Sequence, residues 1–322
     1  MIVGHARQLR YFERVVKNGR VAHAYLFSGP DAVGKRTVAL AFAKTLLCSE
    51  NAEKAFGGCG WCEDCRLAEA STHPDLLALR PGDLAEAGDT GREIGIAQVH
   101  ELTRLLAQTA WRAGWRAVII DGAHALSRDA QAALLKTMEE PKANVVFFFI
   151  TSRPGALVPT IHSRSVPVSF TTILDADLEP LLAPLPRTRH AFLLALAEGR
   201  AGLLCRLMND PKAFSAHEAE VARFMKLLES DLSEQFSFSE TESREPGRLE
   251  AWYAFLVRHL AAELRRALDD VSETGQGPER LAGFLSSLLR NYSLLETAAV
   301  NRRLWCDSIF FELQALARSV PL

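Results

Sequence analysis

A glycine-rich segment, GPDAVGKRT at residues 29–37, constrains the fold of this chain more than any other feature. It follows the apolar run AYLF from Ala24 and opens an apolar helical pattern from about Lys35 to Leu47. Between a strand and a helix, such a loop lets backbone N–H groups, the helix N-terminus and a lysine attract a phosphate group. This order predicts a phosphate-binding loop on a parallel sheet. An ordinary turn of small residues is the alternative.

The same alternation continues to about residue 170. Four more runs are rich in β-branched and aromatic residues: DLLAL from Asp75, AVIID from Ala117, VVFFFIT from Val145 and VPVSF from Val166. Helical patterns run from about Ile96 to Ala110 and from Ser127 to Glu140. Buried strands separated by helices are typical of a parallel sheet covered on both faces. We therefore predict an α/β core with a parallel five-stranded sheet over residues 1–170.

The remainder of the chain shows helical periodicity without strands. Residues 171–212 contain short helical patterns broken by proline and glycine, and residues 213–322 show longer apolar stripes. We predict a small helical unit followed by an all-α domain. The polar stretch SEQFSFSETESREPG from Ser233 is expected to be an exposed loop of that domain.

Composition excludes several classes of protein. The chain has 322 residues, 24% of them charged, and a formal net charge of -2, so no overall basic field favours nucleic acid. No apolar run reaches the length of a membrane span, and the first residues carry charges where a signal peptide needs an apolar run. We expect a cytoplasmic protein with no membrane contact.

The glycine-rich loop departs from a magnesium-binding phosphate loop at one position. Gly29, Gly34 and Lys35 are in place, but the residue after the lysine is Arg36 where a Ser or Thr would bind Mg²⁺. Thr37 comes one residue later, and one residue along a helix turns a side chain by about 100°. ATP with Mg²⁺ is therefore a doubtful ligand of this loop.

The motif around Asp121 lacks another residue of an active ATPase. Asp121 ends the strand AVIID, where nucleotide-binding sheets carry the carboxylate that orients Mg²⁺. The next residue is Gly122, where an active ATPase has a glutamate that polarises the attacking water. Loss of a positioned base removes about 10²–10⁴ in rate. These positions argue against hydrolysis, while an anion pocket remains compatible with them.

Four of the six cysteines form a cluster with the spacing of a metal site. Cys48, Cys59, Cys62 and Cys65 follow the pattern C-x10-C-x2-C-x2-C, with glycines between the first two. Four thiolates suit tetrahedral Zn²⁺, and a site with four protein ligands is structural. Buried free thiols and a redox pair are the alternatives. Cys205 and Cys306 lie in apolar helical patterns and are expected to be small core residues.

Five motifs in this order resemble one family, the AAA+ subunits of the bacterial DNA polymerase III clamp loader. The matching segments are HAYLFSGPDAVGK from His23, the cysteine knuckle at 48–65, AVIIDGAHAL from Ala117, ALLKTMEEP from Ala133 and HSRS from His162. ETAAVNRRLWCDSIFFEL near the end is a weaker match. The resemblance implies an AAA+ core over 1–170, a helical lid over 171–212 and a helical collar over 213–322 that assembles five subunits into a ring.

The resemblance also implies a function and partners. Such a ring opens the sliding clamp and places it on primer-template DNA, using ATP bound by its motor subunits. The losses at Arg36 and Gly122 are similar to those of the non-hydrolysing member of the ring. Its partners would be the motor (tau/gamma) and delta subunits and, through the complex, the sliding clamp and the DNA.

Two polar residues match functional positions of that family. In the segment Ser163-Arg164-Ser165, Arg164 resembles an arginine finger that reaches the nucleotide of the neighbouring subunit, although the family has cysteine at Ser165. Thr151 matches a sensor of the γ-phosphate. A surface arginine and a polar strand end are the alternatives. A second sensor stays unassigned.

Two other functions remain to be separated from this one. The chain could be the ATP-hydrolysing motor (tau/gamma-type) subunit of the same loader, which Arg36 and Gly122 oppose. A stand-alone P-loop kinase would need an intact magnesium site and an acceptor pocket, and the long helical C-terminal region is not typical of one.

Overall fold

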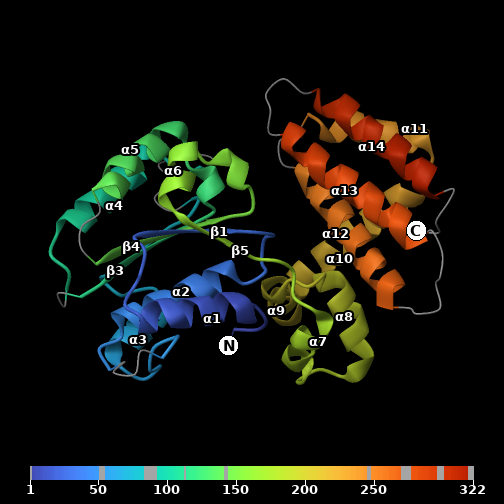
Figure 1. The fold of residues 1–322 in the computed structure, drawn as a ribbon. Helices are drawn as coiled ribbons and strands as arrows, with labels where there is room; N and C mark the ends of the chain where they lie inside the picture. Colours follow the sequence, from blue (N-terminus) through green and yellow to red (C-terminus); the bar gives the residue numbers. More distant parts are fainter. Residues whose placement is uncertain are drawn as a thin grey trace. The chain divides into compact units, whose positions relative to one another are not determined.

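The computed structural model describes residues 2–50, 55–82, 93–111, 114–140, 144–244, 248–269, 277–295 and 301–317. The chain forms two compact units. The first, called the core unit here, contains residues 1–190 and 199–205. The second, called the helical unit, contains residues 191–198 and 206–322 (Figure 1). The division into core, lid and collar at residues 170 and 212 stays a prediction.

The core unit is built on the predicted parallel sheet. Its strands are β1 (Ala24–Ser28), β2 (Leu76–Leu79), β3 (Arg116–Asp121), β4 (Val145–Thr151) and β5 (Val166–Ser169). They pair in the order β2-β3-β4-β1-β5, and every pair is parallel. The prediction of five parallel strands is confirmed. Because the strands are parallel, the loops that follow them gather at one edge of the sheet.

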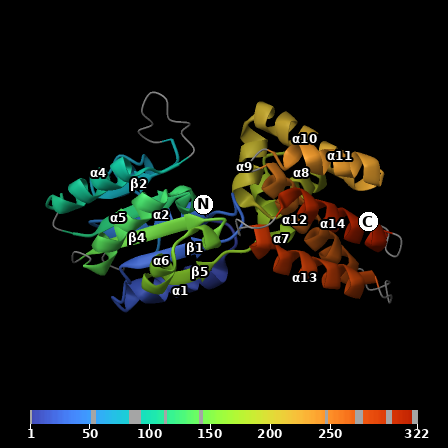
Figure 2. The same cartoon turned by 90° about the horizontal axis from the view of Figure 1, so that it is seen from above.

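Helices cover both faces of this sheet, as Figures 1 and 2 show. One face packs against α1 (Ala6–Lys17), α2 (Lys35–Leu47) and α3 (Glu63–Glu69), and the other against α4 (Ile96–Ala107), α5 (Arg128–Glu139) and α6 (Pro159–Arg164). Successive residues of β4 alternate between the two cores, Phe147 in one and Phe148 in the other. Each phenylalanine is fully buried, which contributes about 1.5–3 kcal/mol by the hydrophobic effect.

The helix boundaries follow local capping signals. The side chain of Ser127 accepts a hydrogen bond from the backbone N–H of Ala130 and caps α5. Pro141, which ends the quoted segment ALLKTMEEP, lies outside the described residues. The core unit also contains α7 (Asp175–Leu178) and the 3-10 helices η1 (Ala123–Ala125), η2 (Pro154–Ala156), η3 (Glu179–Leu182) and η4 (Arg187–Arg189). Helices α8 (His190–Ala197) and α9 (Ala201–Asn209) follow.

The helical unit is an α-helical bundle, as predicted. Besides most of α8, its longer helices are α10 (Pro211–Glu229), α11 (Leu232–Glu242), α12 (Arg248–Asp269), α13 (Gly277–Leu295) and α14 (Arg302–Ala317), which pack together in Figure 2. Trp252 and Phe310 lie fully buried at the centre of its core, with their rings 4.8 Å apart. Cys306 is buried in the same core, as expected. Cys205 is exposed, so its assignment as a core residue is wrong.

One predicted loop is a helix. The stretch from Ser233 was expected to be exposed, but α11 occupies most of it and buries Gln235, Ser239 and Glu242. The Gln235 amide donates to the backbone oxygens of Leu227 and Ser230. Polar side chains are compatible with burial when their hydrogen bonds are made within the protein. Residues 245–247 of this stretch lie outside the described residues.

Among the residues that the structure describes, none forms a helix with both the length and the apolar character needed to span a bilayer.

Candidate functional site

The glycines of the phosphate loop adopt conformations that other residues rarely take. Gly29 has φ +143°, and a Cβ there would lie 2.1 Å from the carbonyl oxygen of Phe170. Gly34 has φ +113° immediately before α2. Both residues must therefore be glycine for backbone reasons. The loop follows β1 and leads into α2 at the carboxyl edge of the sheet, as predicted from its sequence.

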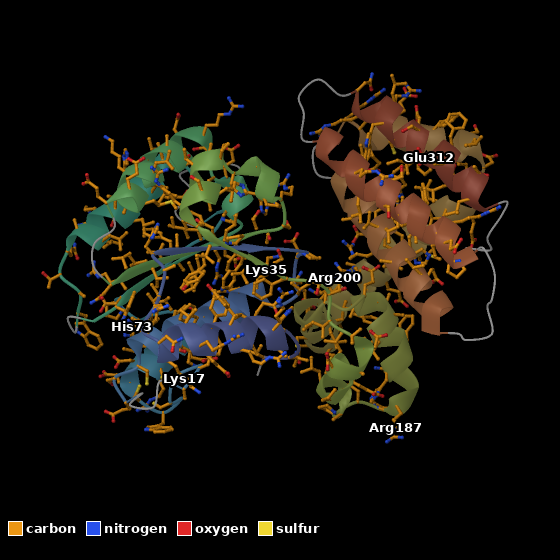
Figure 3. The ribbon with its side chains drawn as sticks, viewed as in Figure 1. Lys17, Lys35, His73, Arg187, Arg200 and Glu312 are labelled. Atoms are coloured by element: carbon orange, nitrogen blue, oxygen red, sulfur yellow. The ribbon has the colours of Figure 1, made fainter. Side chains whose placement is uncertain are left out.

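Lys35 is turned onto its own loop. Its ammonium donates hydrogen bonds to the backbone oxygens of Gly29 and Pro30, each at 2.6 Å, and the residue is 5% exposed. Burial lowers the pKa of this lysine, against the opposing charges of Asp31 and Asp121. Figure 3 shows it at the end of α2 beside the sheet. A phosphate group would have to compete with two carbonyl oxygens for this cation.

Arg36 faces the carboxylate that would orient magnesium. Its Nε atom lies 3.7 Å from Oδ2 of Asp121, at the end of β3. Burial raises the pKa of Asp121, and the positive charges of Arg80 and Lys35 act in the opposite direction. In place of a hydroxyl and a carboxylate that share a divalent cation, the site has a guanidinium beside the carboxylate. That pair is compensated in charge without a metal ion.

The backbone conformation at Gly122 disfavours a catalytic carboxylate at this position. Gly122 has φ +83°, and a Cβ there would lie 3.2 Å from Cδ of Pro81. A glutamate in this place would combine an unfavourable backbone conformation with a tight contact. The local backbone conformation therefore favours glycine at the position where an active ATPase has its catalytic glutamate.

The loop also borders a small cavity of the core unit. It has a volume of about 80 Å³ and is lined by residues that include His5, Val33, Thr37 and Gly202. The N–H of Gly202 donates to the carbonyl oxygen of Ala32 at 2.7 Å, which brings α9 directly against the loop. Pockets for small ligands are typically about 300–1,000 Å³. In this conformation the cavity is too small for a nucleoside.

Thr151 lies in the same region, at the end of β4. It is 1% exposed, its Oγ1 lies 3.2 Å from Nδ1 of His124, and it accepts a hydrogen bond from the N–H of Arg153. The structure therefore brings the ends of β1, β3 and β4 together around Lys35, Asp121 and Thr151. Lys35 bonds to backbone oxygens of its loop, Asp121 faces Arg36, and Thr151 contacts His124.

The four cysteines converge as their spacing predicts. The Sγ atoms of Cys48, Cys59, Cys62 and Cys65 all lie within 4.8 Å of one another. Backbone N–H groups donate to three of these sulfurs, at 3.3–3.4 Å. For Cys62, burial raises the thiol pKa, but hydrogen bonds from the Cys65 N–H and the other thiols outweigh it and bring the pKa to about 6. The cluster could hold a metal ion, and its soft donors fit zinc.

The knuckle contains a buried carboxylate and is remote from the phosphate loop. Asp64 is fully buried, accepts a hydrogen bond from the N–H of Ser49 and lies 3.4 Å from Nε2 of His73. Helix α2 joins Lys35 to the first cysteine across 13 residues, which at 1.5 Å each is about 20 Å. Figure 3 shows Lys35 and His73 well apart in the core unit. A metal in the knuckle is thus too distant to take part in phosphate chemistry.

Arg164 is separate from these groups. It is the last residue of α6, and its Nη2 donates to Oε1 of Glu139 at 3.0 Å. The side chain is 36% exposed. It lies in none of the contacts described around Lys35, so the structure does not bring it to this chain's own phosphate loop.

Ser165, beside it, gives a stability prediction. The residue is 8% exposed, and its Oγ has no hydrogen-bond partner among the described residues. A buried unsatisfied hydroxyl costs about 1–3 kcal/mol. We expect Ser165→Ala to raise the free energy of unfolding by about 1 kcal/mol in urea denaturation. Ser163→Ala, which alters an exposed serine of the adjoining helix α6, is the control and should change the free energy of unfolding by less than about 0.5 kcal/mol. A loss of stability in Ser165→Ala would contradict the reasoning.

Two residues that contact the predicted site positions were not identified from the sequence. Glu139 contacts Arg164, and Pro81 lies against Gly122. Glu139 lies inside the segment ALLKTMEEP, and one signal was present: two adjacent glutamates end a helix, where the helix dipole disfavours negative charge. Pro81 carried no such signal. Its contact with Gly122 depends on the pairing of β2 with β3.

Comparison with known proteins places the chain in one family. Residues 4–173 match the family described as DNA polymerase III, delta subunit. The DNA polymerase III subunit delta' of Pseudomonas aeruginosa is 42% identical over 145 residues, which cover 45% of this chain and 42% of that protein. The subunit delta' of Bacillus subtilis is 28% identical, covering 72% of this chain and 67% of the other. The subunit gamma/tau of Mycobacterium bovis is 28% identical, covering 87% and 46%.

A solved structure also aligns along most of the chain. A DNA polymerase III gamma subunit-related protein of Thermotoga maritima matches with a TM-score of 0.42 and 17% identity, covering 96% of this chain and 99% of that one. The chain spans less than half the length of the delta' protein of Pseudomonas aeruginosa in the matched region. The family match covers more than half of this chain and includes both the phosphate loop and the knuckle. The chain therefore belongs to the DNA polymerase III delta subunit family and is a relative of its delta' subunits.

Proposed function

We propose that this chain acts in DNA replication as the delta' subunit of a DNA polymerase III clamp loader. In this role it is a non-hydrolysing AAA+ subunit of a ring that places the sliding clamp on primer-template DNA. The contact between Arg36 and Asp121 carries the proposal, because a guanidinium faces the carboxylate that a motor subunit would use for magnesium. Gly122 supports it, since the residue has no side chain and its backbone conformation disfavours a glutamate there.

In this proposal the chain contributes to hydrolysis in trans. Arg164 would reach the phosphates bound by a neighbouring motor (tau/gamma) subunit, and the helical unit would form the collar through which the motor and delta subunits assemble. The knuckle would hold one structural Zn²⁺. The Arg164 side chain is 36% exposed and contacts Glu139 on a neighbouring helix, which supports the trans arrangement.

The motor subunit is the second candidate, favoured by one observation. The relative named gamma/tau aligns over 87% of this chain, more than the delta' relative of Pseudomonas aeruginosa. A motor must hydrolyse ATP itself. Arg36 and Gly122 oppose this, as set out above.

Reconstitution separates the two candidates. The full chain is mixed with motor and delta subunits, and the size of the complex and the rate of clamp loading on primer-template DNA are measured. We expect a stable complex, clamp loading that requires this chain, and no magnesium-dependent ATP turnover by the chain alone. Turnover by the isolated chain at the rate of the motor would support the second candidate instead, and failure to join the complex would reject both.

A further inference from the structure

The ion pair between Arg164 and Glu139 joins the ends of two helices. Glu139 is the last residue of α5 and Arg164 the last residue of α6. Nη2 of the arginine donates to Oε1 of the glutamate at 3.0 Å, and the two side chains are 36% and 49% exposed. The pair is therefore reached by solvent, and by any group that a second subunit brings to it.

Glu139 is not expected to stabilise its own helix. The C-terminal end of a helix carries partial negative charge, which disfavours a carboxylate. A second glutamate, Glu140, follows directly, and Lys136 is the basic residue of the last turn. The contact that compensates Glu139 comes from Arg164, on another helix. This observation points to a role for the carboxylate outside α5.

The backbones of the two helices are held in register by a buried glutamine. Gln131 of α5 is 3% exposed and donates from Nε2 to the carbonyl oxygens of Leu126 and Ala156. Its Oε1 accepts a hydrogen bond from the N–H of Val158, the residue before α6. The start of α6 is thus fixed against α5. The Arg164 side chain is the part that remains to be ordered.

Glu139 uses only part of the guanidinium. Arginine has five N–H donors in a planar fork, and one of them, on Nη2, bonds to Glu139. Within the described part of the chain, the Arg164 guanidinium makes no second hydrogen bond. We propose that Glu139 is a positioning residue for Arg164, holding one edge of the guanidinium so that its other donors face a phosphoryl group of the neighbouring subunit. This inference rests on the proposed function.

The strength of the contact fits that role. An arginine side chain loses much rotamer freedom when it is immobilised, and prior ordering reduces the loss that accompanies binding. A solvent-exposed ion pair is also weak, so it orders the side chain without sequestering it. A phosphoryl group with several negative charges can then bind the remaining N–H donors of Arg164, while the Glu139 carboxylate keeps its hydrogen bond from Nη2.

The test uses the reconstituted ring and the neighbour's ATP turnover. We expect Glu139→Ala to lower kcat about three- to tenfold and to leave KM for ATP unchanged, because the nucleotide pocket belongs to the neighbour. Glu139→Gln keeps an acceptor oxygen and should recover most of the lost rate. Glu140→Ala removes the adjacent carboxylate and is the matched control, expected to leave kcat within twofold.

A double substitution distinguishes positioning from a structural role. In single-turnover hydrolysis, Glu139→Ala should have no further effect once Arg164 is alanine, because there is no guanidinium left to orient. An equal loss in both backgrounds would overturn the proposal, as would unchanged kcat in Glu139→Ala. If Arg164→Ala lowers turnover and Glu139→Ala does not, the positioning role fails while the trans function stands. If Arg164→Ala has no effect, both fail.

Discussion

Arg164→Ala is expected to lower ATP turnover by the neighbouring motor subunit about 10³-fold while leaving ring assembly intact. A guanidinium delivered in trans stabilises the charge that develops on the transferring phosphoryl group, and its removal leaves that charge uncompensated. Assembly should persist because the side chain is partly exposed and its one described contact is an exposed ion pair of small stabilising effect. Single-turnover hydrolysis in the reconstituted ring measures the change.

A matched arginine controls for loss of surface charge. Arg104 of α4 pairs with Glu101 in another exposed ion pair of the core unit. Arg104→Ala should leave turnover unchanged. Arg164→Lys should restore only part of the rate, since an ammonium keeps the charge but loses the planar fork. Normal turnover in Arg164→Ala within an assembled ring would reject the trans role.

Cys65→Ala is expected to abolish metal binding by the knuckle and to unfold it locally. Cys65 is 1% exposed, and its sulfur is in contact range of the other three. Structural zinc contributes about 10–16 kcal/mol of apparent binding free energy in small zinc domains, so three remaining ligands hold the ion far more weakly. Metal analysis should fall from about one Zn per chain to nearly none. The melting temperature should fall, and protease should cleave near residues 55–65 first.

Cys205→Ala is the matched control, because that cysteine is exposed and outside the cluster. It should retain the full metal content and the melting temperature of the unaltered chain. Exhaustive chelation of the unaltered chain should reproduce the effect of Cys65→Ala. Unaltered protein that is purified without chelator and holds no zinc would show that the cluster is a set of buried thiols.

The candidate site was predictable where chemistry depends on local order. The glycines and Lys35 predict a phosphate loop, and the cysteine spacing predicts a metal knuckle. Both were recognisable because the residues that form each motif are close in sequence. The pairing of Arg36 with Asp121 was not predictable from either motif, since β1 and β3 are distant in sequence and are separated in the sheet by β4. Sequence showed that a magnesium ligand was missing. The structure shows what faces the carboxylate instead.

Helix α11 is an element that the sequence analysis predicted wrongly. Its polar sequence was taken to indicate an exposed loop, because hydrophobic periodicity reports burial only where apolar side chains do the packing. The buried Ser239 donates a hydrogen bond to Asp307 of α14, and the buried Glu242 accepts one from Arg223 of α10. Such partners come from other segments, and a single stretch of sequence does not contain them.

By itself, the sequence was sufficient for the parallel sheet, its covering helices and the clustering of the four cysteines. These depend on side-chain periodicity and on spacings that the local backbone converts directly into geometry. Tertiary structure alone decided that Pro81 lies against Gly122 and that Glu139 meets Arg164. Each is a contact between atoms whose separation depends on the packing of whole strands and helices, and no short-range pattern encodes that distance.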